Sequence, residues 1–232
     1  MNNSSAIFAF DFDGTLTTCD TLPAFIRHVC GTRRLLCGIA LYSPVLVLMK
    51  LRLYPNWKAK QRIFAHFFGG MAEREFDGHC ADFARAHRHL LRPGGVDTLQ
   101  RALGQGARVA VVSASVDRWV RPFFGLPAGP EGAAERAAEA EAPLVVIGTQ
   151  IEVAGGRLTG RFLTPNCYGP EKVRRLRAAF PDLPSRRLVA FGDSRGDREL
   201  LQIAAEAHYK PFRQLSVWPF GGLLPIRYLC KK

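Results

Sequence analysis

Ala6-Ile7-Phe8-Ala9-Phe10-Asp11-Phe12-Asp13-Gly14-Thr15-Leu16-Thr17 is the stretch that decides the fold of this chain. Its apolar run, from Ala6 to Phe12, has the length and composition of a buried strand, and Gly14 ends it. In open α/β sheets, ligands bind beyond the carboxyl ends of the strands. Two carboxylates at Asp11 and Asp13 can supply a nucleophile and a general acid/base to one substrate there. The alternative is a chance acidic strand end, because structural carboxylates also collect at such positions.

The charge of the chain is strongly positive and unevenly distributed. A net charge of +12 predicts attraction to anions, which include phosphorylated substrates, nucleic acid and acidic membrane surfaces. No acidic residue lies between Thr21 and Ala72, and none follows Glu206. A solvated basic face explains this pattern as well as a surface that holds anions or an anionic membrane over the site. No nucleic-acid partner is expected, because the basic span contains no recognisable DNA or RNA module.

The length of 232 residues fits one large domain, or a domain with a small accessory one. The six cysteines form no C-x-x-C pair, and the chain starts without a charged and then apolar leader. We therefore interpret them as reduced thiols and expect a cytoplasmic protein, peripheral to the inner membrane if its basic surface binds lipid.

Short β-type runs alternate with helical stretches, which predicts a doubly wound (Rossmann-like) parallel α/β sheet. After the first strand, strands are expected at 109–112, 144–148, 188–191 and 207–209. Helices are expected near 95–103, 116–124, 171–179 and 197–205. The predicted core domain comprises residues 1–16 and 93–232, and residues 17–92 are predicted to form an inserted helical cap domain.

Three further segments carry expectations. Residues 150–162 contain Gly155-Gly156 between β-formers and predict a hairpin. Pro127 to Pro143 is rich in Pro, Gly, Ala and Glu and reads as a surface loop or weak helix. Leu35 to Met49 is uncharged over 15 residues, which predicts two buried helical turns broken at Pro44, with a membrane-surface role as the alternative.

Three more features follow predicted strands or begin predicted helices. Ser113 follows a strand and suits a phosphate oxygen, although a helix cap is the better explanation if Ser113 is taken alone. Lys172 falls in a first helical turn, where the helix dipole disfavours a cation, so an anionic partner or a solvated lysine accounts for it. Asp193 and Asp197 flank a glycine turn and suit a hard cation such as Mg²⁺, although a capped helix followed by another acid is the alternative.

Together these residues resemble the haloacid dehalogenase-like (HAD) superfamily. Its four motifs match in order, as Asp11 to Thr17, Ser113, Lys172 and Gly192-Asp193 through Asp197. The insertion after the first motif resembles the helical cap of the phosphoserine phosphatase-like subfamily (IB), and Gly156 to Gly160 resembles that subfamily's hairpin. The resemblance spans nearly the whole chain and includes bacterial histidinol-phosphatase and phosphatidylglycerophosphatase C relatives.

The resemblance implies a magnesium-dependent phosphatase, a phosphoric monoester hydrolase. Asp11 would be the nucleophile that forms an aspartyl-phosphate, and Asp13 the general acid and base. Ser113 and Lys172 would hold the phosphoryl group. Mg²⁺ would be bound by Asp11, the backbone carbonyl of Asp13, and Asp193, with Asp197 supporting the metal. This arrangement suits phosphoryl transfer, which mainly needs in-line positioning and charge neutralisation.

The substrate is less well defined by the resemblance. Asp20 stands where phosphoserine phosphatases place a glutamate that binds the substrate's amine, and it equally suits the cap of a helix. Gly196 stands where those enzymes place Asn, and Arg195 either contacts substrate or is a surface cation. The expected partner is a small phosphorylated substrate of the phosphoserine or histidinol phosphate type. The alternatives are a phosphatidylglycerophosphate-type lipid at an anionic membrane surface, and a non-catalytic anion- or membrane-binding protein.

Overall fold

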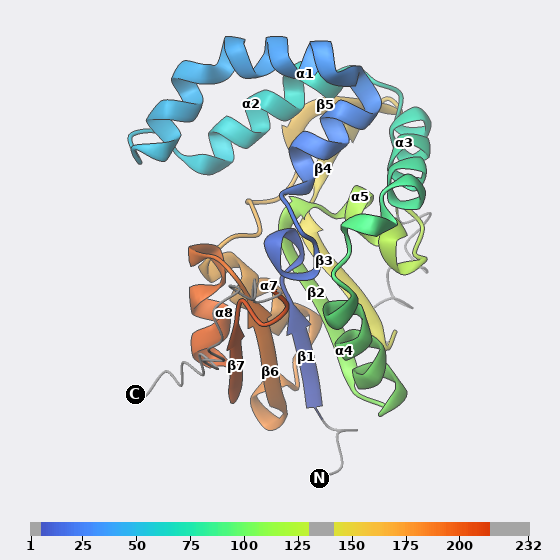
Figure 1. The fold of residues 1–232 in the computed structure, drawn as a ribbon, viewed down its shortest axis with the longest axis vertical. Coiled ribbons are helices and arrows are strands. Elements are labelled where there is room, and N and C mark those ends of the chain that lie inside the picture. The colour runs from blue at the N-terminus through green and yellow to red at the C-terminus, as the bar shows by residue number, and fades with distance from the viewer. Residues whose placement is uncertain (1–5, 130–141, 214–232) are drawn as a thin grey trace, which may run out of the picture.

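The computed structural model of the chain describes residues 6–129 and 142–213. At its centre lies a five-stranded parallel sheet in the order β3-β2-β1-β6-β7 (Figure 1). The doubly wound parallel sheet predicted from the sequence is confirmed. The strands of this sheet are β1 (Ala6–Phe10), β2 (Arg108–Val116), β3 (Leu144–Thr149), β6 (Arg187–Gly192) and β7 (Glu206–Tyr209).

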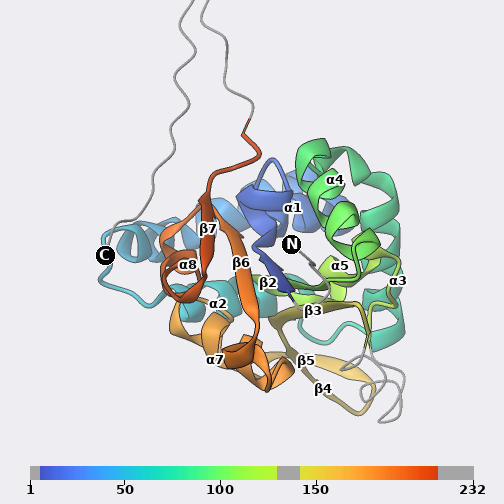
Figure 2. The same cartoon turned by 90° about the horizontal axis from the view of Figure 1, so that it is seen from below.

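Helices cover both faces of the sheet (Figure 2). Helices α7 (Pro170–Ala179) and α8 (Arg198–Ile203) pack on the face that receives Ile7 and Ala9 of β1. The opposite face receives Phe10 and packs against α4 (Pro93–Gly104), while the short α5 (Asp117–Val120) follows β2. Because alternate residues of a strand point to opposite faces, an apolar run such as that of β1 is needed when both faces are covered.

The order of the strands reverses beside β1. The chain runs from β1 to β2 and β3 on one side, and then crosses to β6 and β7 on the other. Ligand sites of open α/β sheets lie outside the carboxyl ends of the strands at such a reversal. The fold therefore places the end of β1, and with it Asp11 and Asp13, at the position where a site is expected.

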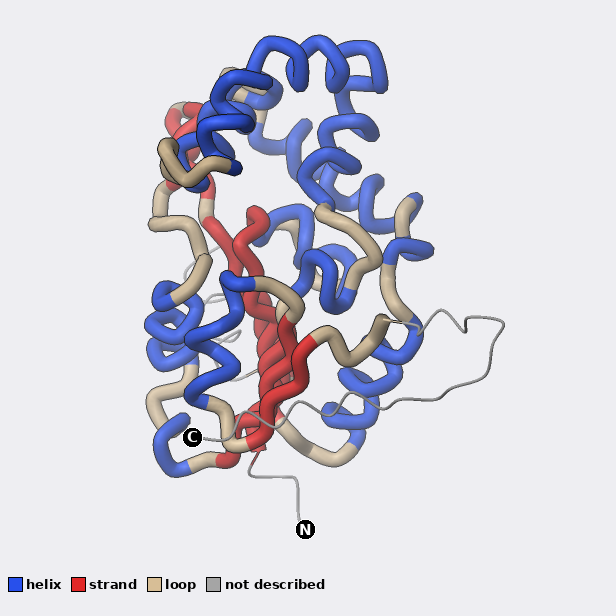
Figure 3. Tube along the Cα trace, turned by 60° about the vertical axis from the view of Figure 1, so that its left-hand side comes forward, coloured by secondary structure: helices blue, strands red, loops and turns tan. Residues whose placement is uncertain are grey.

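A helical unit lies above the carboxyl ends of the strands (Figure 3). It contains α1 (Thr21–Lys50), α2 (Asn56–Phe68), α3 (Glu73–Ala86) and a 3₁₀ turn (Arg88–Leu90). The chain leaves and re-enters the core at adjacent points, where the Arg92 N–H donates to the Leu16 carbonyl (2.7 Å). The predicted hairpin is present as β4 (Ile151–Ala154) and β5 (Arg157–Phe162), and it packs against α2 rather than joining the central sheet.

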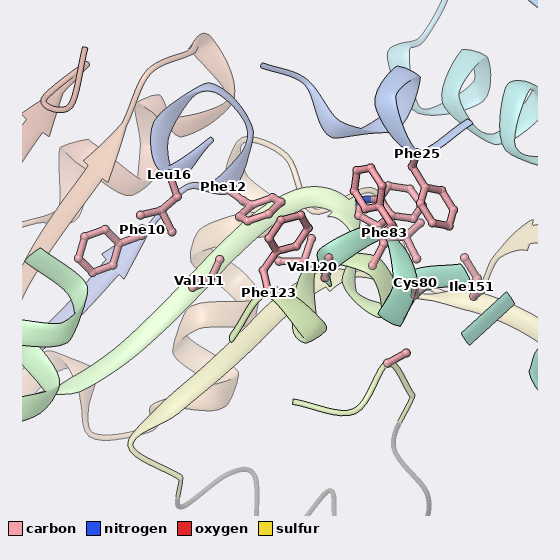
Figure 4. Packing of buried hydrophobic residues seen from close by; sticks show 14 of the residues in the cluster. Phe10, Phe12, Leu16, Phe25, Cys80, Phe83, Val111, Val120, Phe123 and Ile151 are labelled. Atoms are coloured by element: carbon pink, nitrogen blue, oxygen red, sulfur yellow. The ribbon is translucent and has the colours of Figure 1, made fainter. Parts of the chain in front are cut away.

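Four aromatic side chains link the helical unit to the sheet (Figure 4). Phe25 of α1 contacts Phe83 of α3 with ring centroids 5.2 Å apart, and Phe83 contacts Phe123 at 5.7 Å. Phe123 in turn contacts Phe12, beside the carboxylates, at 5.4 Å. Edge-to-face contacts of this kind add to the burial of apolar surface, so the helical unit and the sheet share one hydrophobic core.

Helix α1 differs from its prediction. The helix bends at Gly31 (φ 82°, ψ 163°), whereas Pro44 lies inside continuous helix. Proline lacks the N–H that would bond the Ala40 carbonyl, and the Ser43 hydroxyl donates to that carbonyl instead (2.8 Å). The prediction of buried turns is also wrong, because most of the run Leu35 to Met49 faces solvent.

The remaining connections are short. They comprise a wide turn at Phe12–Leu16 and 3₁₀ turns at Arg121–Phe124, Leu183–Ser185 and Arg195–Asp197. Most of the predicted loop Pro127 to Pro143 lies outside the described residues. Five cysteines within the described ranges are free thiols, as the sequence predicted.

Candidate active site

Six of the side chains predicted to form a site lie together at the carboxyl ends of β1, β2 and β6. Asp11 and Asp13 follow β1, and Ser113 lies in β2, which continues to Val116 instead of ending at the serine. Lys172 occupies the first turn of α7, whose Pro170 suits the start of a helix. Asp193 and Asp197 follow β6.

Lys172 is buried between two carboxylates. Its Nζ donates to Asp11 Oδ1 (2.5 Å), to Asp197 Oδ1 (2.6 Å) and to the Val112 carbonyl (2.8 Å). All three donor sites of the ammonium are therefore used. Lys172 is fixed beside the predicted nucleophile, and the alternative of a solvated lysine is excluded.

Asp13 faces hydroxyl groups instead of a cation. Its Oδ1 accepts hydrogen bonds from the Thr21 N–H (2.8 Å) and the Thr21 hydroxyl (2.6 Å). Its Oδ2 accepts from the Ser115 hydroxyl (2.5 Å) and, more weakly, from the Ser113 hydroxyl (3.4 Å). The Ser113 hydroxyl itself accepts from the Ser115 N–H (3.0 Å), which places it between the strand backbone and the carboxylate.

Asp193 approaches this pair of carboxylates because residue 14 is glycine. A Cβ at Gly14 would stand 2.5 Å from Asp193 Oδ2, and Gly14 has φ +81°, which side chains rarely adopt. The Arg213 guanidinium also contacts Asp193 Oδ2, at 2.7 Å. Thus the glycine that ends the predicted strand also creates the space for a third carboxylate.

Asp197 organises the turn after β6. Its Oδ2 accepts hydrogen bonds from the N–H groups of Asp193 (3.2 Å) and Ser194 (3.0 Å) and from the Ser194 hydroxyl (2.8 Å). With its other oxygen bonded to Lys172, Asp197 holds both the turn and the lysine. The predicted support of the metal by Asp197 would thus act through the position of Asp193.

The three carboxylates have the composition of a site for a hard divalent cation. One oxygen from each of Asp11, Asp193 and Asp197 lies within 4.8 Å of the others. Carboxylate oxygens are the ligands that Mg²⁺ prefers, usually one or two per site with water and substrate phosphate. Asp11 and Asp193 fit that role, because Asp197 is committed to hydrogen bonds within the protein.

The pKa shifts of the buried charged groups also favour a bound cation. Burial raises the pKa of Asp11 to about 7, although Lys172 opposes the shift. Burial acts to raise the pKa of Asp197 as well, but Lys172 and the hydrogen bonds from Ser194 together outweigh it, and the pKa of Asp197 is lowered. Burial would lower the pKa of Lys172, and the two carboxylates outweigh it, so its pKa is raised. Lys172 alone therefore does not offset the effect of burial on Asp11, and a second cation beside this carboxyl would favour its ionised form.

A cavity of about 390 Å³ opens over these groups. Helix α2 contributes Asn56 and Lys60 to its wall, and Tyr168 closes another side. The remaining lining residues are Asp11, Asp13, Gly14, Thr18, Cys19, Asp20, Ala114, Lys172, Asp193, Ser194, Gly196 and Arg213. A larger hollow, of about 520 Å³ between α7 and α8, is lined by none of the six converging side chains.

Asp20 has the helix-cap role that the sequence offered, and its contact with substrate stays a prediction. Its Oδ1 accepts the Leu22 N–H (3.0 Å) and caps α1, and its side chain also lines the cavity. Partial loss of solvent raises the pKa of Asp20, Asp13 adds to that shift, and Lys60 opposes it. Its second oxygen is placed where a substrate amine or hydroxyl could be bound.

Gly196 and Tyr168 explain one departure from the phosphoserine phosphatase pattern. A Cβ at position 196 would stand 2.4 Å from Tyr168 Cε2, so an asparagine there would collide with the tyrosine ring. Tyr168 therefore fills the space next to the turn and lines the cavity. Arg195 is exposed and is not among the cavity-lining residues, which favours its interpretation as a surface cation.

Several lining and supporting residues were not identified from the sequence. Thr21 and Ser115 hold Asp13, and Trp119 Nε1 donates to the Thr21 hydroxyl (3.2 Å). Ser115 could have been predicted from the sequence, because residues two apart on an extended strand share a face and Ser113 was already a candidate. The place of Lys60 in the cavity wall could not, since it depends on how α2 packs.

The chain is similar to known proteins over most of its length. Residues 8–202 match the family described as haloacid dehalogenase-like hydrolase. Protein CicA of Caulobacter vibrioides is 34% identical over 217 residues, which cover 92% of this chain and 89% of CicA.

Two solved structures show the same fold at low sequence identity. A phosphoserine phosphohydrolase-like protein from Francisella tularensis superimposes with a TM-score of 0.56 at 14% identity, covering 88% of this chain and 85% of that one. A HAD family hydrolase from Salmonella enterica serovar Typhi gives 0.57 at 19% identity over 86% of this chain, which spans only 60% of that longer protein.

Proposed function

The chain belongs to the haloacid dehalogenase-like hydrolase family, and on that premise we propose that it is a magnesium-dependent phosphatase acting through an aspartyl-phosphate at Asp11. The resemblance to the haloacid dehalogenase-like superfamily predicted from the sequence is confirmed, and hydrolysis of phosphoric monoesters is the activity that we propose for this hydrolase. The observation that carries the proposed mechanism is the buried Asp11–Lys172–Asp197 cluster facing a cavity that Asp13 also lines.

Each side chain is suited to one part of the reaction. Asp11 would attack the phosphorus atom, while the Lys172 ammonium offsets the charge that accumulates on the transferred oxygens. Asp13 would give its proton to the leaving oxygen and later take one from the attacking water, as a general acid and base. The hydroxyls of Thr21 and Ser115 hold the Asp13 carboxyl in place for both steps. Ser113 would bind a phosphoryl oxygen.

Mg²⁺ would be held by Asp11 and Asp193, with Asp197 keeping Asp193 in position. When bound, this cation neutralises phosphate charge and keeps Asp11 ionised. The raised pKa of Asp11 and the grouped carboxylates support this assignment.

The cavity wall supports a small phosphorylated substrate with a polar remainder. Asp20 and Lys60 line the same mouth and offer an anion and a cation to the part of the substrate beyond the phosphate. A phosphomonoester carrying an amine, of the phosphoserine or histidinol phosphate type, suits Asp20.

A cytoplasmic location agrees with five free thiols among the described residues.

A second candidate substrate is a lipid phosphate of the phosphatidylglycerophosphate type. The exposed apolar surface of α1 favours it, because α1 leads directly into the helix that supplies Asn56 and Lys60 to the cavity. A lipid substrate would keep its phosphate in the same cluster, and only the remainder of the molecule would differ.

The test is phosphate release from para-nitrophenyl phosphate with and without Mg²⁺, followed by the candidate substrates. Wild type should release phosphate only with the metal, and Asp11→Asn should release none. Asp97→Asn makes the same chemical change on the exposed side of α4 and should behave as wild type. Equal activity of Asp11→Asn and Asp97→Asn would rule out Asp11 as the nucleophile.

A further inference from the structure

The exposed apolar residues of the described chain gather on one part of the helical unit. Eight of the twelve large apolar side chains that are exposed lie between residues 36 and 57. They include Leu36, Ile39, Leu41 and Val47 of α1, and Leu51 and Leu53 of the turn that follows. We call this surface the α1 outer face.

The part of the α1 outer face that lies on α1 before Lys50 is uncharged as well as exposed. No charged residue occurs between Arg34 and Lys50, so the solvent-facing side of this helix has no polar stripe of the usual kind. Only 6% of the residues in the most apolar stretch of α1 are buried within the described part of the protein. Large exposed apolar patches of this kind mark sites where a protein surface binds another protein or a membrane.

The shape of the helix determines how it could meet a membrane. Helix α1, Thr21–Lys50, is long and apolar enough to cross a membrane by length and composition. However, Phe25 and Ile26 are buried in the core. The uncharged run of 15 residues is only about 22 Å long, against about 30 Å for the hydrocarbon layer. This run suits a helix lying in the interface better than one crossing it.

Cations frame the α1 outer face at both ends. Arg33 and Arg34 precede the uncharged run, and Lys50 and Arg52 follow it, and all four are exposed. The absence of acidic residues from Thr21 to Ala72 leaves these charges without a partner of opposite sign in the same segment. An apolar surface bordered by cations matches the chemistry of an anionic lipid interface.

We propose that the α1 outer face docks on an anionic membrane, with the uncharged run in the acyl boundary and the flanking cations among the headgroups. A second copy of the chain fits this surface less well, because two-fold docking would bring the same cations together with no acid in the segment to pair them. The docking does not depend on catalysis. It would place Asn56 and Lys60, and so the mouth of the cavity, beside the lipid surface.

The test is sedimentation of the full chain with vesicles of phosphatidylcholine alone or mixed with phosphatidylglycerol. Wild type should sediment with the mixed vesicles and much less with phosphatidylcholine alone. Arg33→Gln with Arg34→Gln should weaken binding to the mixed vesicles by about 25-fold, since each cation near an anionic surface contributes about fivefold. This loss should shrink with added salt.

The apolar contribution is tested by a matched pair of substitutions. Leu41 and Leu163 are both 63% exposed, and Leu163 lies outside the α1 outer face. Leu41→Glu should reduce vesicle binding by more than about tenfold, because it removes a leucine side chain that the docked lipid would bury and adds an anion. Leu163→Glu should leave binding unchanged, and both variants should retain wild-type circular dichroism and hydrolysis of para-nitrophenyl phosphate.

Three outcomes would overturn the proposal. Wild type could remain in the supernatant with the mixed vesicles at low salt, as it would if another part of the chain covered the face. Leu41→Glu and Leu163→Glu could affect binding equally. Finally, wild type could elute as a dimer that Leu41→Glu dissociates while vesicle binding is absent, which would assign the face to a second copy of the chain.

Discussion

Lys172 is the side chain whose removal tests most directly how charge is balanced in the site. Lys172→Met keeps most of the shape of the side chain but removes the ammonium that contacts Asp11, Asp197 and the Val112 carbonyl. The side chain of Lys172 is 2% exposed, so water cannot replace these contacts without rearrangement. Loss of one partner from a buried ion pair costs about 3–5 kcal/mol of folding stability. For a chain of this size that corresponds to a fall in Tm on the order of 10 °C.

The loss of folding stability in Lys172→Met should become larger as pH rises. Lys172 opposes the upward shift of the Asp11 pKa, so without it that pKa should rise above about 7. A carboxyl whose folded pKa lies above its usual 3.8 stabilises the fold below that value and loses the contribution as pH rises through the folded pKa. The stability deficit of Lys172→Met should therefore be smaller at about pH 5 than at about pH 8.

Urea unfolding at several pH values, with hydrolysis of para-nitrophenyl phosphate, measures both effects. Activity should fall by at least about 100-fold, because the positive charge that fixes Asp11 and offsets the charge on the transferred oxygens is lost. Lys60→Met, at the mouth of the cavity, should leave stability near that of wild type. Adding Asp197→Asn to Lys172→Met should recover part of the stability but no activity. The reasoning is refuted if Lys172→Met is no less stable than Lys60→Met, or if its deficit does not change with pH.

Three further substitutions test the site and the helix α7 that supplies Lys172 to it. Gly14→Ala should reduce Mg²⁺ affinity and activity at least about tenfold, because its Cβ would stand 2.5 Å from Asp193 Oδ2; Gly78→Ala, in open space on α3, should leave both unchanged in isothermal titration and turnover assays. Ser115→Ala should lower kcat by about tenfold or more while KM changes little, because it removes a hydrogen bond that orients Asp13; a change confined to KM would contradict this. Glu171→Gln should cost about 1 kcal/mol at neutral pH, after allowance for solvent screening. Hydrogen bonds from Arg174, with a smaller effect of Arg175, lower the pKa of Glu171 from 4.5 to about 2, so its contribution is present above pH 4.5 and disappears as pH falls through 2; urea titrations in which Glu171→Gln and Glu75→Gln behave alike would contradict it.

The sheet and the convergence of the site were predictable because both depend on local sequence. Four strands of the central sheet, β1, β2, β3 and β6, contain short apolar runs, and the runs at 6–10, 109–112 and 188–191 lead to the carboxylates and the hydroxyl of the site. Once parallel pairing is inferred from the alternation of strands and helices, the side chains that follow β1 and β6 must lie at one edge. No long-range information beyond that alternation was needed to bring Asp11 and Asp193 together.

The environment of α1 was not predictable in the same way. Hydrophobicity shows that a segment avoids charge, but it does not show how many layers of protein surround it. The α1–α2 pair is a single helical layer, packed so closely at Gly38 that a Cβ there would stand 2.3 Å from Phe67 Cζ. Only one side of α1 is covered by that packing, and the other side stays exposed although its composition is that of a core.

Asp11 and Asp13 are separated by one residue, yet the fold gives them different partners. Asp11 receives Lys172 from α7, a helix of the core, and is fixed beside a cation. Asp13 receives the N–H and hydroxyl of Thr21, the first residue of α1, and is thereby tied to the helical unit. The proposed nucleophile is thus held by the sheet and its helices, whereas the proposed general acid and base is held where the helical unit meets the site. This division explains how a nucleophile and an acid/base can share one short motif, because their different environments come from elements that lie far apart in the sequence.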